Sequence, residues 1–336
     1  MKIGKSIFLC CLIGSPFSSF ADNLRLAVVP KEENNPFFLK TGEGCKAAAQ
    51  ELVNVECIFR VSKNIDVRKQ DQVIEKLINE GVDGLAIAVT QSEFLAMNSV
   101  KKAIEKGIPV ITYDADFSPR DLQKNPSLRS AYIGTDDFEI GKALGERLKH
   151  FRPEGGTLVI QSGRPDSPNL NLRVMGVRSA LSGNNNKEQL SERLKGQNGW
   201  KEFRNPMYNF GQFFRALKDM QTVLAIHKSK GIDSFVAVGG WPQFIDGYRE
   251  LLQPYQSQLA SKEIVVVIAD TADVQLEYLK EKLAHGNVGQ NPFEMGRQAI
   301  FLLYKIVKNQ PYNEINHIPM TYCNQQNYQT CVVKRP

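Results

Sequence analysis

Short apolar runs alternate with longer amphipathic stretches along most of this chain, and that alternation restricts the possible folds more than any other feature. The apolar runs near the start, each of strand length, cover 24–29, 55–61, 84–89 and 109–113. The amphipathic stretches between them cover 37–52, 67–80 and 93–106. Continuous apolar strands linked by helices are typical of a parallel sheet that is covered on both faces. This part of the chain therefore predicts a doubly wound α/β domain.

The pattern begins again in the second half of the chain. A strand at 131–133 and a helix at 138–151 are followed by strands predicted at 157–161, 235–238 and 264–268 and by helices at 172–181 and 213–230. A length of 336 residues is enough for two domains, each with its own core. The predicted fold class is α/β, with two doubly wound lobes.

Polar segments interrupt this pattern. Residues 182–199 are rich in Asn, Gly and Lys and predict a surface loop. Residues 119–126 predict a second polar interruption, just before the chain crosses between the domains. The tail after Pro311 predicts irregular structure apart from a short strand at 318–322.

The first 21 residues have the composition of a secretory signal. Two lysines precede an apolar run at 7–13, and the segment ends with small residues at the positions that a signal peptidase accepts. We expect cleavage after Ala21 and export to the periplasm. The alternative, a lipoprotein, would be acylated on Cys10 or Cys11, but bulky residues precede both. Removing the two lysines lowers the formal net charge from +6 to +4, a surplus too mild to indicate nucleic-acid binding.

The cysteine pattern predicts disulfides rather than a metal site. Of the six cysteines, Cys45, Cys57, Cys323 and Cys331 remain after removal of the signal, and they allow three connectivities. We predict the pairs Cys45–Cys57 and Cys323–Cys331, because each closes a short local loop. A zinc site would need closely spaced cysteine pairs or interleaved histidines, and the four histidines are scattered. Paired cysteines indicate an oxidising compartment.

The residues that follow the predicted strands carry most of the functional information, because open α/β sheets bind ligands beyond the carboxyl ends of their strands. The first strand is followed by Asn-Asn-Pro-Phe-Phe at 34–38. Asn35 predicts a helix cap and Pro36 the first helical position. Phe37 and Phe38 point about 100° apart on a helix, so both cannot face one core stripe. We expect one of the two rings to face the crevice.

Polar residues at further strand and helix ends of both lobes add to this candidate site. Asp114 and Asp270 each follow a predicted strand, where a carboxylate is either a turn residue or a ligand contact. Arg173 lies near the start of a helix, where a positive charge opposes the helix dipole, so an anionic or hydroxyl partner explains it better than helix stability does. The amide of Gln290 can donate and accept at once.

Taken together, these motifs resemble the periplasmic sugar-binding proteins of the ribose and galactose type. The resemblance covers nearly the whole mature chain. It depends on Asn-Asn-Pro-Phe-Phe at 34–38, Gly-Val-Asp-Gly-Leu at 81–85, Gly-Ile-Pro-Val-Ile-Thr-Tyr-Asp at 107–114, Tyr-Ile-Gly-Thr-Asp-Asp at 132–137, Arg-Val-Met-Gly at 173–176 and Val-Gly-Gln-Asn-Pro at 288–292. It implies two α/β lobes, joined by three crossing strands, that close on a monosaccharide.

The resemblance also implies a set of ligand contacts. Carried over by motif, they are Asn35, Phe37, Phe38, Asp114, Arg173, Asp270 and Gln290. Carboxylates accept from sugar hydroxyls, a guanidinium donates in a fixed fork, and an aromatic face covers the apolar side of a sugar ring. Ribose-type proteins carry an arginine directly after the aspartate at 114, where this chain has Ala115.

A second departure concerns the opposite wall of the site. The family places an asparagine near Gly240, where this chain reads Val-Gly-Gly-Trp-Pro-Gln at 238–243. We expect Trp241 to form the second aromatic wall, with Tyr208 or Phe210 as alternatives. Both departures indicate a ligand other than ribose itself.

The expected function is a periplasmic receptor that binds a monosaccharide or related polyol and delivers it to an ABC importer. The alternative is a signalling subunit that docks on a membrane histidine kinase or chemoreceptor. Repressors with this fold need a helix-turn-helix before the first lobe, where only the signal lies. No nucleophile-elbow, dinucleotide-binding, phosphate-loop or zinc-protease motif occurs, and Asp114 with Asp270 is explained more simply by ligand acceptance than by glycoside hydrolysis. We therefore expect a monomeric binding protein without catalytic activity, cofactor or metal.

The lobes are expected to be discontinuous in sequence. The predicted first lobe comprises 22–134 and 291–316, and the second comprises 135–290 and 317–336. Hinge segments are expected near 134–136, 289–291 and 316–318. Each predicted disulfide lies within one lobe, so neither restricts closure.

Overall fold

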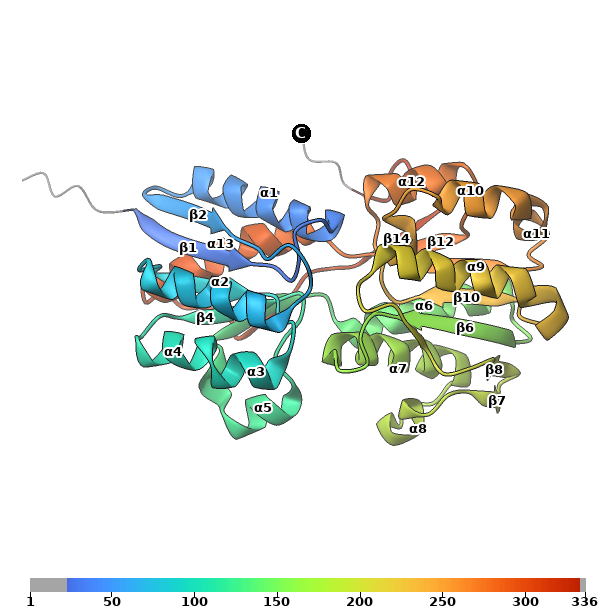
Figure 1. Ribbon diagram of the computed structural model, residues 1–336, viewed down its shortest axis with the longest axis horizontal. Coiled ribbons are helices and arrows are strands. Elements are labelled where there is room, and N and C mark those ends of the chain that lie inside the picture. The colour runs from blue at the N-terminus through green and yellow to red at the C-terminus, as the bar shows by residue number, and fades with distance from the viewer. Residues whose placement is uncertain (1–22, 333–336) are drawn as a thin grey trace, which may run out of the picture.

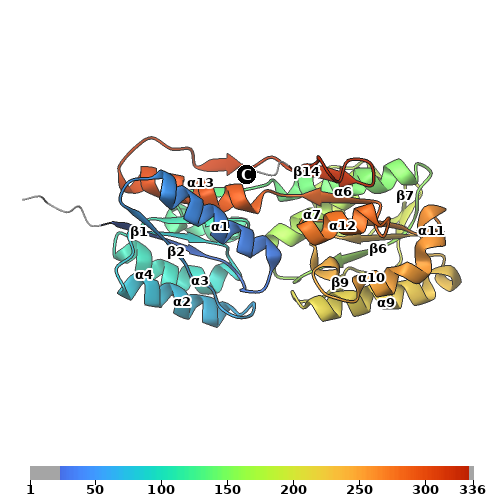
Figure 2. The ribbon, with the colours of Figure 1, turned by 90° about the horizontal axis from the view of Figure 1, so that it is seen from above.

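Two α/β lobes lie side by side in the computed structural model, which describes residues 23–332 (Figures 1 and 2). The signal segment predicted at 1–21 lies outside the described residues. Within the described part of the chain, no helix is long and apolar enough to cross a membrane.

The first lobe is built on a parallel sheet with the strand order β13-β5-β4-β3-β1-β2. Its strands are β1 (Leu24–Val29), β2 (Val55–Phe59), β3 (Gly84–Ile87), β4 (Val110–Tyr113), β5 (Ala131–Gly134) and β13 (Ile315–His317). Its helices are α1 (Pro36–Glu51), α2 (Val67–Asn79), α3 (Ser92–Met97), α4 (Ser99–Glu105), α5 (Pro119–Lys124), η1 (Pro126–Leu128) and α13 (Pro292–Val307). Apolar side chains on both faces of the sheet pack under these helices.

The second lobe repeats this plan with the strand order β14-β12-β11-β10-β6-β8-β7, and β9 also pairs with β6. Its strands are β6 (Gly156–Ser162), β7 (Lys195–Gln197), β8 (Trp200–Glu202), β9 (Met207–Tyr208), β10 (Ser234–Ala237), β11 (Val265–Ala269), β12 (Gly286–Gly289) and β14 (Thr321–Asn324). Its helices are α6 (Asp137–Phe151), α7 (Pro168–Ser182), α8 (Lys187–Ser191), α9 (Phe213–Lys230), η2 (Trp241–Gln243), α10 (Tyr248–Leu252), η3 (Gln253–Tyr255), α11 (Gln256–Ala260) and α12 (Asp273–Lys280). The pairing of β14 with β12 and that of β7 with β8 are antiparallel.

Glycines bring one pair of helices into close contact in each lobe. A Cβ atom on Gly44 of α1 would lie 1.9 Å from the carbonyl oxygen of Phe293 in α13. A Cβ atom on Gly141 of α6 would lie 1.9 Å from the carbonyl oxygen of Arg173 in α7. Only a residue without Cβ permits such an approach. This packing fixes the start of α7, which carries Arg173, against α6.

The chain passes between the two sheets after β5, after β12 and between β13 and β14. These passages coincide with the segments expected to act as hinges. The lobe limits at 134, 290 and 316 stay a prediction, and the strand β13 ends at His317.

The predicted loops contain more regular structure than the sequence pattern indicated. Residues 182–199 include α8 and β7, and residues 119–126 include α5. Side-chain caps explain both helices, because Asn186 accepts from two backbone N–H groups of α8 and Ser118 accepts from one of α5. Such short capped helices carry too few turns to produce a helical period.

Two further elements differ from expectation. The helix predicted at 93–106 is divided into α3 and α4 at Asn98, whose backbone leaves the helical region. The tail holds two strands, β13 and β14, in place of the one predicted at 318–322. Each strand joins a different sheet, and a local pattern carries no information about which sheet a strand joins.

Both predicted disulfides are confirmed. Cys45 in α1 is bonded to Cys57 in β2, and Cys323 in β14 is bonded to Cys331. The first disulfide ties a helix to the edge strand of its sheet, because β2 lies at the end of the strand order.

Removing the first disulfide, as Cys45→Ala/Cys57→Ala, is expected to lower the free energy of unfolding by about 2 to 3 kcal/mol, since the unfolded chain loses a cross-link. Urea denaturation of the wild type and the variant measures this loss. Cys323→Ala/Cys331→Ala, with a sequence separation of 8 rather than 12, is expected to lose somewhat less. An unchanged denaturation midpoint in the first variant would contradict the expectation.

Candidate ligand-binding site

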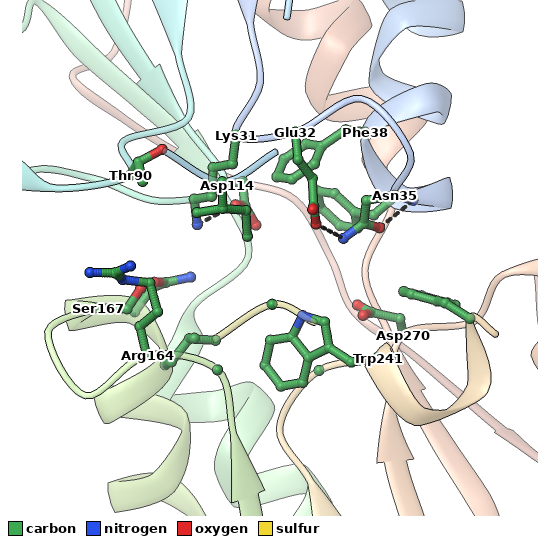
Figure 3. A pocket seen from close by; sticks show the side chains of 18 of the residues that line it. Lys31, Glu32, Asn35, Phe38, Thr90, Asp114, Arg164, Ser167, Trp241 and Asp270 are labelled. Carbon is green, nitrogen blue, oxygen red and sulfur yellow. Dashed lines mark hydrogen bonds and ion pairs between the residues drawn. The ribbon is translucent and has the colours of Figure 1, made fainter. Parts of the chain in front are cut away.

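A pocket lies between the lobes, at the carboxyl ends of the central strands of both sheets (Figure 3). The space open to the centres of water molecules is about 70 Å³, which is several times the 10–15 Å³ that one water needs. The first lobe contributes Lys31, Glu32, Asn35, Phe37, Phe38, Ile65, Thr90 and Asp114. The second contributes Gly163, Arg164, Ser167, Asn169, Leu170, Arg173, Gly211, Gly239, Trp241, Phe244 and Asp270, and Gln290 follows β12.

The structure brings together every residue that the sequence analysis singled out for ligand contact. These residues are Asn35, Phe37, Phe38, Asp114, Arg173, Trp241, Asp270 and Gln290. The alternatives to Trp241, Tyr208 and Phe210, are not among the lining residues of this pocket. Phe244, which the sequence analysis did not consider, provides an aromatic ring near Trp241 instead.

Aromatic rings face the pocket from both lobes. Phe37 and Phe38 stand nearly perpendicular, with ring centroids 5.2 Å apart. Asn35 orients them by capping α1, because its side chain accepts from the N–H of Phe37 at 3.0 Å. The helix geometry alone indicated that one ring would face the crevice, whereas both rings line the pocket and both also pack against the core of the first lobe.

Glycines make room for the indole of Trp241 on the opposite wall. A Cβ atom on Gly239 would lie 2.5 Å from the indole ring, and one on Gly163 would lie 3.0 Å from it. The indole therefore rests on bare backbone at the ends of β10 and β6, where Figure 3 shows it facing the pocket. The Val-Gly-Gly-Trp motif is explained by this contact.

The two strand-end aspartates have the same local structure. Asp114 has a φ of 59° and Asp270 a φ of 70°, and aspartate tolerates this left-handed conformation better than most residues. The N–H of Asp114 donates to Ile133 and that of Asp270 donates to Val288, each on a neighbouring strand. The backbone thereby turns sharply at each strand end and directs a carboxylate into the pocket.

Lys31 supplies a cation next to Asp114. Its Nζ atom lies 3.1 Å from Oδ2 of Asp114, and both side chains are largely buried. The family's arginine directly after this aspartate is replaced by Ala115, and the lysine comes from the end of β1 instead. Sequence reasoning missed Lys31, although its place directly after the first strand is the same signal that pointed to the aspartates.

Replacing Lys31 by methionine is expected to lower the free energy of unfolding by about 2 kcal/mol, because the Asp114 carboxylate would stay buried without its counter-ion. Urea denaturation checks this value. The double variant Lys31→Met/Asp114→Asn removes both charges and is expected to regain most of the loss. An equal loss in the single and double variants would contradict the pairing.

Arg173 is held in place by Asp137, which sequence reasoning also missed. The Nε atom donates to Oδ1 of Asp137 at 2.7 Å, and Nη1 donates to the carbonyl of Val238 at 3.0 Å. Burial raises the pKa of Asp137 to about 6, although Arg173 acts in the opposite direction. Burial disfavours the charged Arg173, but the carboxylates around it outweigh that effect and raise the pKa of the guanidinium.

Asp270 and Gln290 form a second polar group in the pocket. Oδ2 of Asp270 accepts from the N–H of Gly240 at 2.9 Å, and Oδ1 lies 3.4 Å from the donating amide of Gln290. Burial raises the pKa of Asp270, and the nearby Arg173 partly offsets this. Within residues 23–332, the Gln290 Oε1 and Thr90 Oγ1 atoms are buried without a hydrogen-bond partner. Buried polar atoms without a partner beside a cavity indicate that a ligand or water supplies the missing hydrogen bond.

Glu32 and Asn35 complete the polar lining of the first lobe. The Asn35 amide donates to Glu32 Oε1 at 3.0 Å, and burial raises the pKa of the Glu32 carboxyl. Across the described residues, no group of three or more His, Cys, Asp or Glu side chains could hold a metal ion. Carboxylates, an amide and a guanidinium between aromatic walls form an arrangement that suits a small ring with many hydroxyl groups.

Two similar α/β lobes with an aromatic and polar pocket between them define the class of two-lobed binding proteins. The model of the periplasmic binding protein domain family matches residues 26–311, and this chain belongs to that family. The resemblance inferred from the motifs and the expected fold class are thereby confirmed.

Individual relatives are binding proteins rather than enzymes. The D-ribose/D-allose-binding protein of Pseudomonas aeruginosa is 31% identical over 159 residues, which cover 47% of this chain and 49% of that protein. The D-apiose import binding protein of Actinobacillus succinogenes is 23% identical over 181 residues, 54% of this chain and 56% of that protein. The chain thus matches about half the length of these curated relatives. They are named for binding a solute.

Solved structures match over nearly the whole chain. The ABC transporter solute-binding protein of Burkholderia graminis, crystallised with D-arabinose, is 25% identical and superposes with a TM-score of 0.77 over 92% of this chain and 98% of that one. A solute-binding protein of Agrobacterium vitis, bound to α-D-tagatopyranose, is 20% identical, with a TM-score of 0.78 over 92% and 97% of the two chains. The second similarity establishes the fold alone.

Proposed function

We propose that this protein is a periplasmic receptor for a neutral monosaccharide or related polyol, and that it delivers this ligand to an ABC importer. The observation that carries the proposal is the pocket between the lobes, in which aromatic rings from both lobes flank strand-end carboxylates. The relatives named for ribose, allose and apiose and the solved structure with D-arabinose support a sugar ligand.

The preference for a neutral ligand follows from the charges in the pocket. Each of its cations already has a carboxylate partner in the protein. Lys31 lies 3.1 Å from Asp114, Arg173 lies 2.7 Å from Asp137, and Arg164 lies 2.7 Å from Asp166. An anionic ligand would meet cations whose charges these carboxylates already compensate, whereas a hydroxyl can donate to a carboxylate and leave the pair intact.

In this proposal each predicted contact has a distinct role. Asp114 and Asp270 accept from sugar hydroxyls. Arg173 donates to a ring or hydroxyl oxygen through the N–H groups that do not donate to Asp137 or Val238. Asn35 orients Phe37 and Phe38, and these rings enclose the apolar faces of the sugar together with Trp241. A ligand hydroxyl donates to the side-chain carbonyl oxygen of Gln290, which has no hydrogen-bond partner among the described residues. The lobes close by rotation about the three passages between the sheets.

Isothermal titration calorimetry of residues 22–336 against a panel of ligands tests the proposal. The panel contains D-ribose, D-allose, D-arabinose, D-xylose, D-galactose, xylitol and myo-inositol, and D-galacturonate and D-glucosamine are the charged controls. We expect binding of at least one neutral member and weaker binding of both charged controls. Failure of every neutral member to evolve heat, or tighter binding of the sugar acid, would refute the proposal.

A further inference from the structure

Ile65 of the first lobe and Gly211 of the second lie against each other beside the pocket. Ile65 belongs to the loop before α2 in the first lobe, and Gly211 belongs to the loop between β9 and α9 in the second. A Cβ atom on Gly211 would lie 2.4 Å from the Cδ1 atom of Ile65, so the isoleucine occupies the space that a side chain at 211 would need. Both residues line the pocket. Their contact therefore joins the two lobes directly beside the site.

The loop that carries Gly211 is held rigidly in the second lobe. The N–H groups of Asn209 and Phe210 donate to the carbonyls of Ser162 and Gly163 at the end of β6. The buried Asn209 side chain accepts from the N–H of Gly211 at 2.8 Å. Gly211 itself has a φ of 77°, in the left-handed region that favours glycine. The loop thus presents bare backbone at a fixed position.

The loop that carries Ile65 is anchored on both sides. Before it, the Ser62 hydroxyl donates to the carbonyl of Asn64 at 3.0 Å. After it, Asp66 caps α2 by accepting from the N–H groups of Arg68 and Lys69. The isoleucine is only partly buried, and its Cδ1 atom lies where a side chain at position 211 of the other lobe would be.

We propose that Ile65 and Gly211 form a latch, an apolar contact made only when the lobes are closed, which slows the release of bound ligand. Opening the cleft separates two residues that belong to different lobes, so the contact disappears and the apolar surface of Ile65 returns to water. The latch makes no polar contact with a ligand, so it stabilises the closed form without regard to the ligand's hydroxyl pattern. The ligand release in this inference rests on the proposed function, whereas the contact itself does not.

Position 211 requires glycine for two reasons, its left-handed backbone and the space that Ile65 occupies. The two effects can be separated by mutation, and this makes the latch testable. Its left-handed backbone is present in the open and the closed form, so the strain of Gly211→Ala lowers stability without changing closure. The clash with Ile65 exists only in the closed form. Truncating Ile65 to alanine relieves the clash and leaves the strain unchanged.

Cross-linking tests the contact without added ligand, because an irreversible reagent captures the closed form each time the two lobes meet, and the linked product accumulates. The double variant Ile65→Cys/Gly211→Cys is treated with a short bifunctional thiol reagent, and the linked peptides are mapped by mass spectrometry. Val53→Cys/Gly211→Cys is the matched control, because Val53 is exposed before β2, at the opposite end of the first lobe's strands. We expect a linked product for the first pair only. Equal linking of both pairs, or none of either, would overturn the latch.

A double-mutant cycle tests its effect on release, with D-arabinose as the ligand and the tryptophan fluorescence as the signal. We expect Gly211→Ala to raise the dissociation rate about tenfold in the Ile65 background and less than about twofold in the Ile65→Ala background. Equal effects in the two backgrounds would overturn the latch. If the wild type does not bind D-arabinose, the proposed function loses that ligand, and the cross-linking result, which needs no ligand, still decides whether the latch exists.

Discussion

Arg173→Met is expected to lower the free energy of unfolding by about 4 kcal/mol and to abolish detectable sugar binding. The substitution leaves the Asp137 carboxylate buried without the guanidinium that donates to it at 2.7 Å, and an uncompensated buried charge is among the most destabilising changes in a protein. It also removes a donor from the pocket. Urea denaturation measures the first effect and titration calorimetry with the best ligand of the panel measures the second.

Two controls separate these effects. Arg173→Met/Asp137→Asn removes both charges, so it is expected to regain most of the stability and none of the binding. The pH dependence gives the second control. The pKa of Asp137 is about 6 in the folded protein against 3.8 ordinarily, so the folded state holds a proton that the unfolded state releases. The contribution of this carboxyl to stability is therefore most favourable below about pH 4 and declines as the pH rises through 6.

Without Arg173 the pKa of Asp137 rises further, because the charge that lowers it is gone. The stability deficit of Arg173→Met is thus expected to be small at pH 5, where the carboxyl is protonated in both proteins, and to reach its full size at pH 8. Denaturation at the two pH values measures this difference. The same deficit at both would show that Asp137 is not its cause.

Asp270→Ala is expected to weaken sugar binding by about 3 kcal/mol, more than a hundredfold in Kd. The substitution leaves the N–H of Gly240 and the Gln290 amide without their acceptor, and it removes the acceptor proposed for a ligand hydroxyl. Titration calorimetry with the sugar that binds the wild type best provides the measurement.

Two controls test Asp270, a conservative change at the same position and the same change at another aspartate. Asp270→Asn keeps a residue that tolerates the left-handed backbone and retains one oxygen, so an intermediate loss is expected. Asp246→Ala makes the same change at an exposed position of the same lobe and is expected to alter Kd less than about twofold. Wild-type affinity in Asp270→Ala would mean that this carboxylate does not contact the ligand.

The sequence predicted the pocket residues that follow strands or begin helices, because those positions are defined by local pattern. Asp114 and Asp270 come directly after apolar runs, and Asn35 precedes a helix with proline at its first position. The same rule applied to the first strand would have found Lys31. Asp137 was within a motif already quoted, but sequence reasoning assigned it no separate role, and the structure shows that its neighbour Asp136 caps α6.

Other pocket residues had no local signal. Phe244 follows a 3₁₀ turn whose position depends on how η2 packs, and Ile65 lies in a loop with neither strand nor helix pattern. Both residues line the pocket only because the folded chain places the other lobe next to them. The short helices α5 and α8 were missed for a related reason, since their stability comes from caps and packing rather than from a repeated apolar face.

The sequence by itself determined the α/β alternation, the disulfide partners and the strand-end residues, since each depends on spacing along a few tens of residues. Only the tertiary structure decided that Lys31 would meet Asp114, that Asp137 would neutralise Arg173, and that Ile65 would lie on Gly211. These contacts join segments between 36 and 146 residues apart, read from their positions in the chain. Charge pairing and close packing at such separations depend on where the sheets and lobes place each backbone, which no local periodicity encodes.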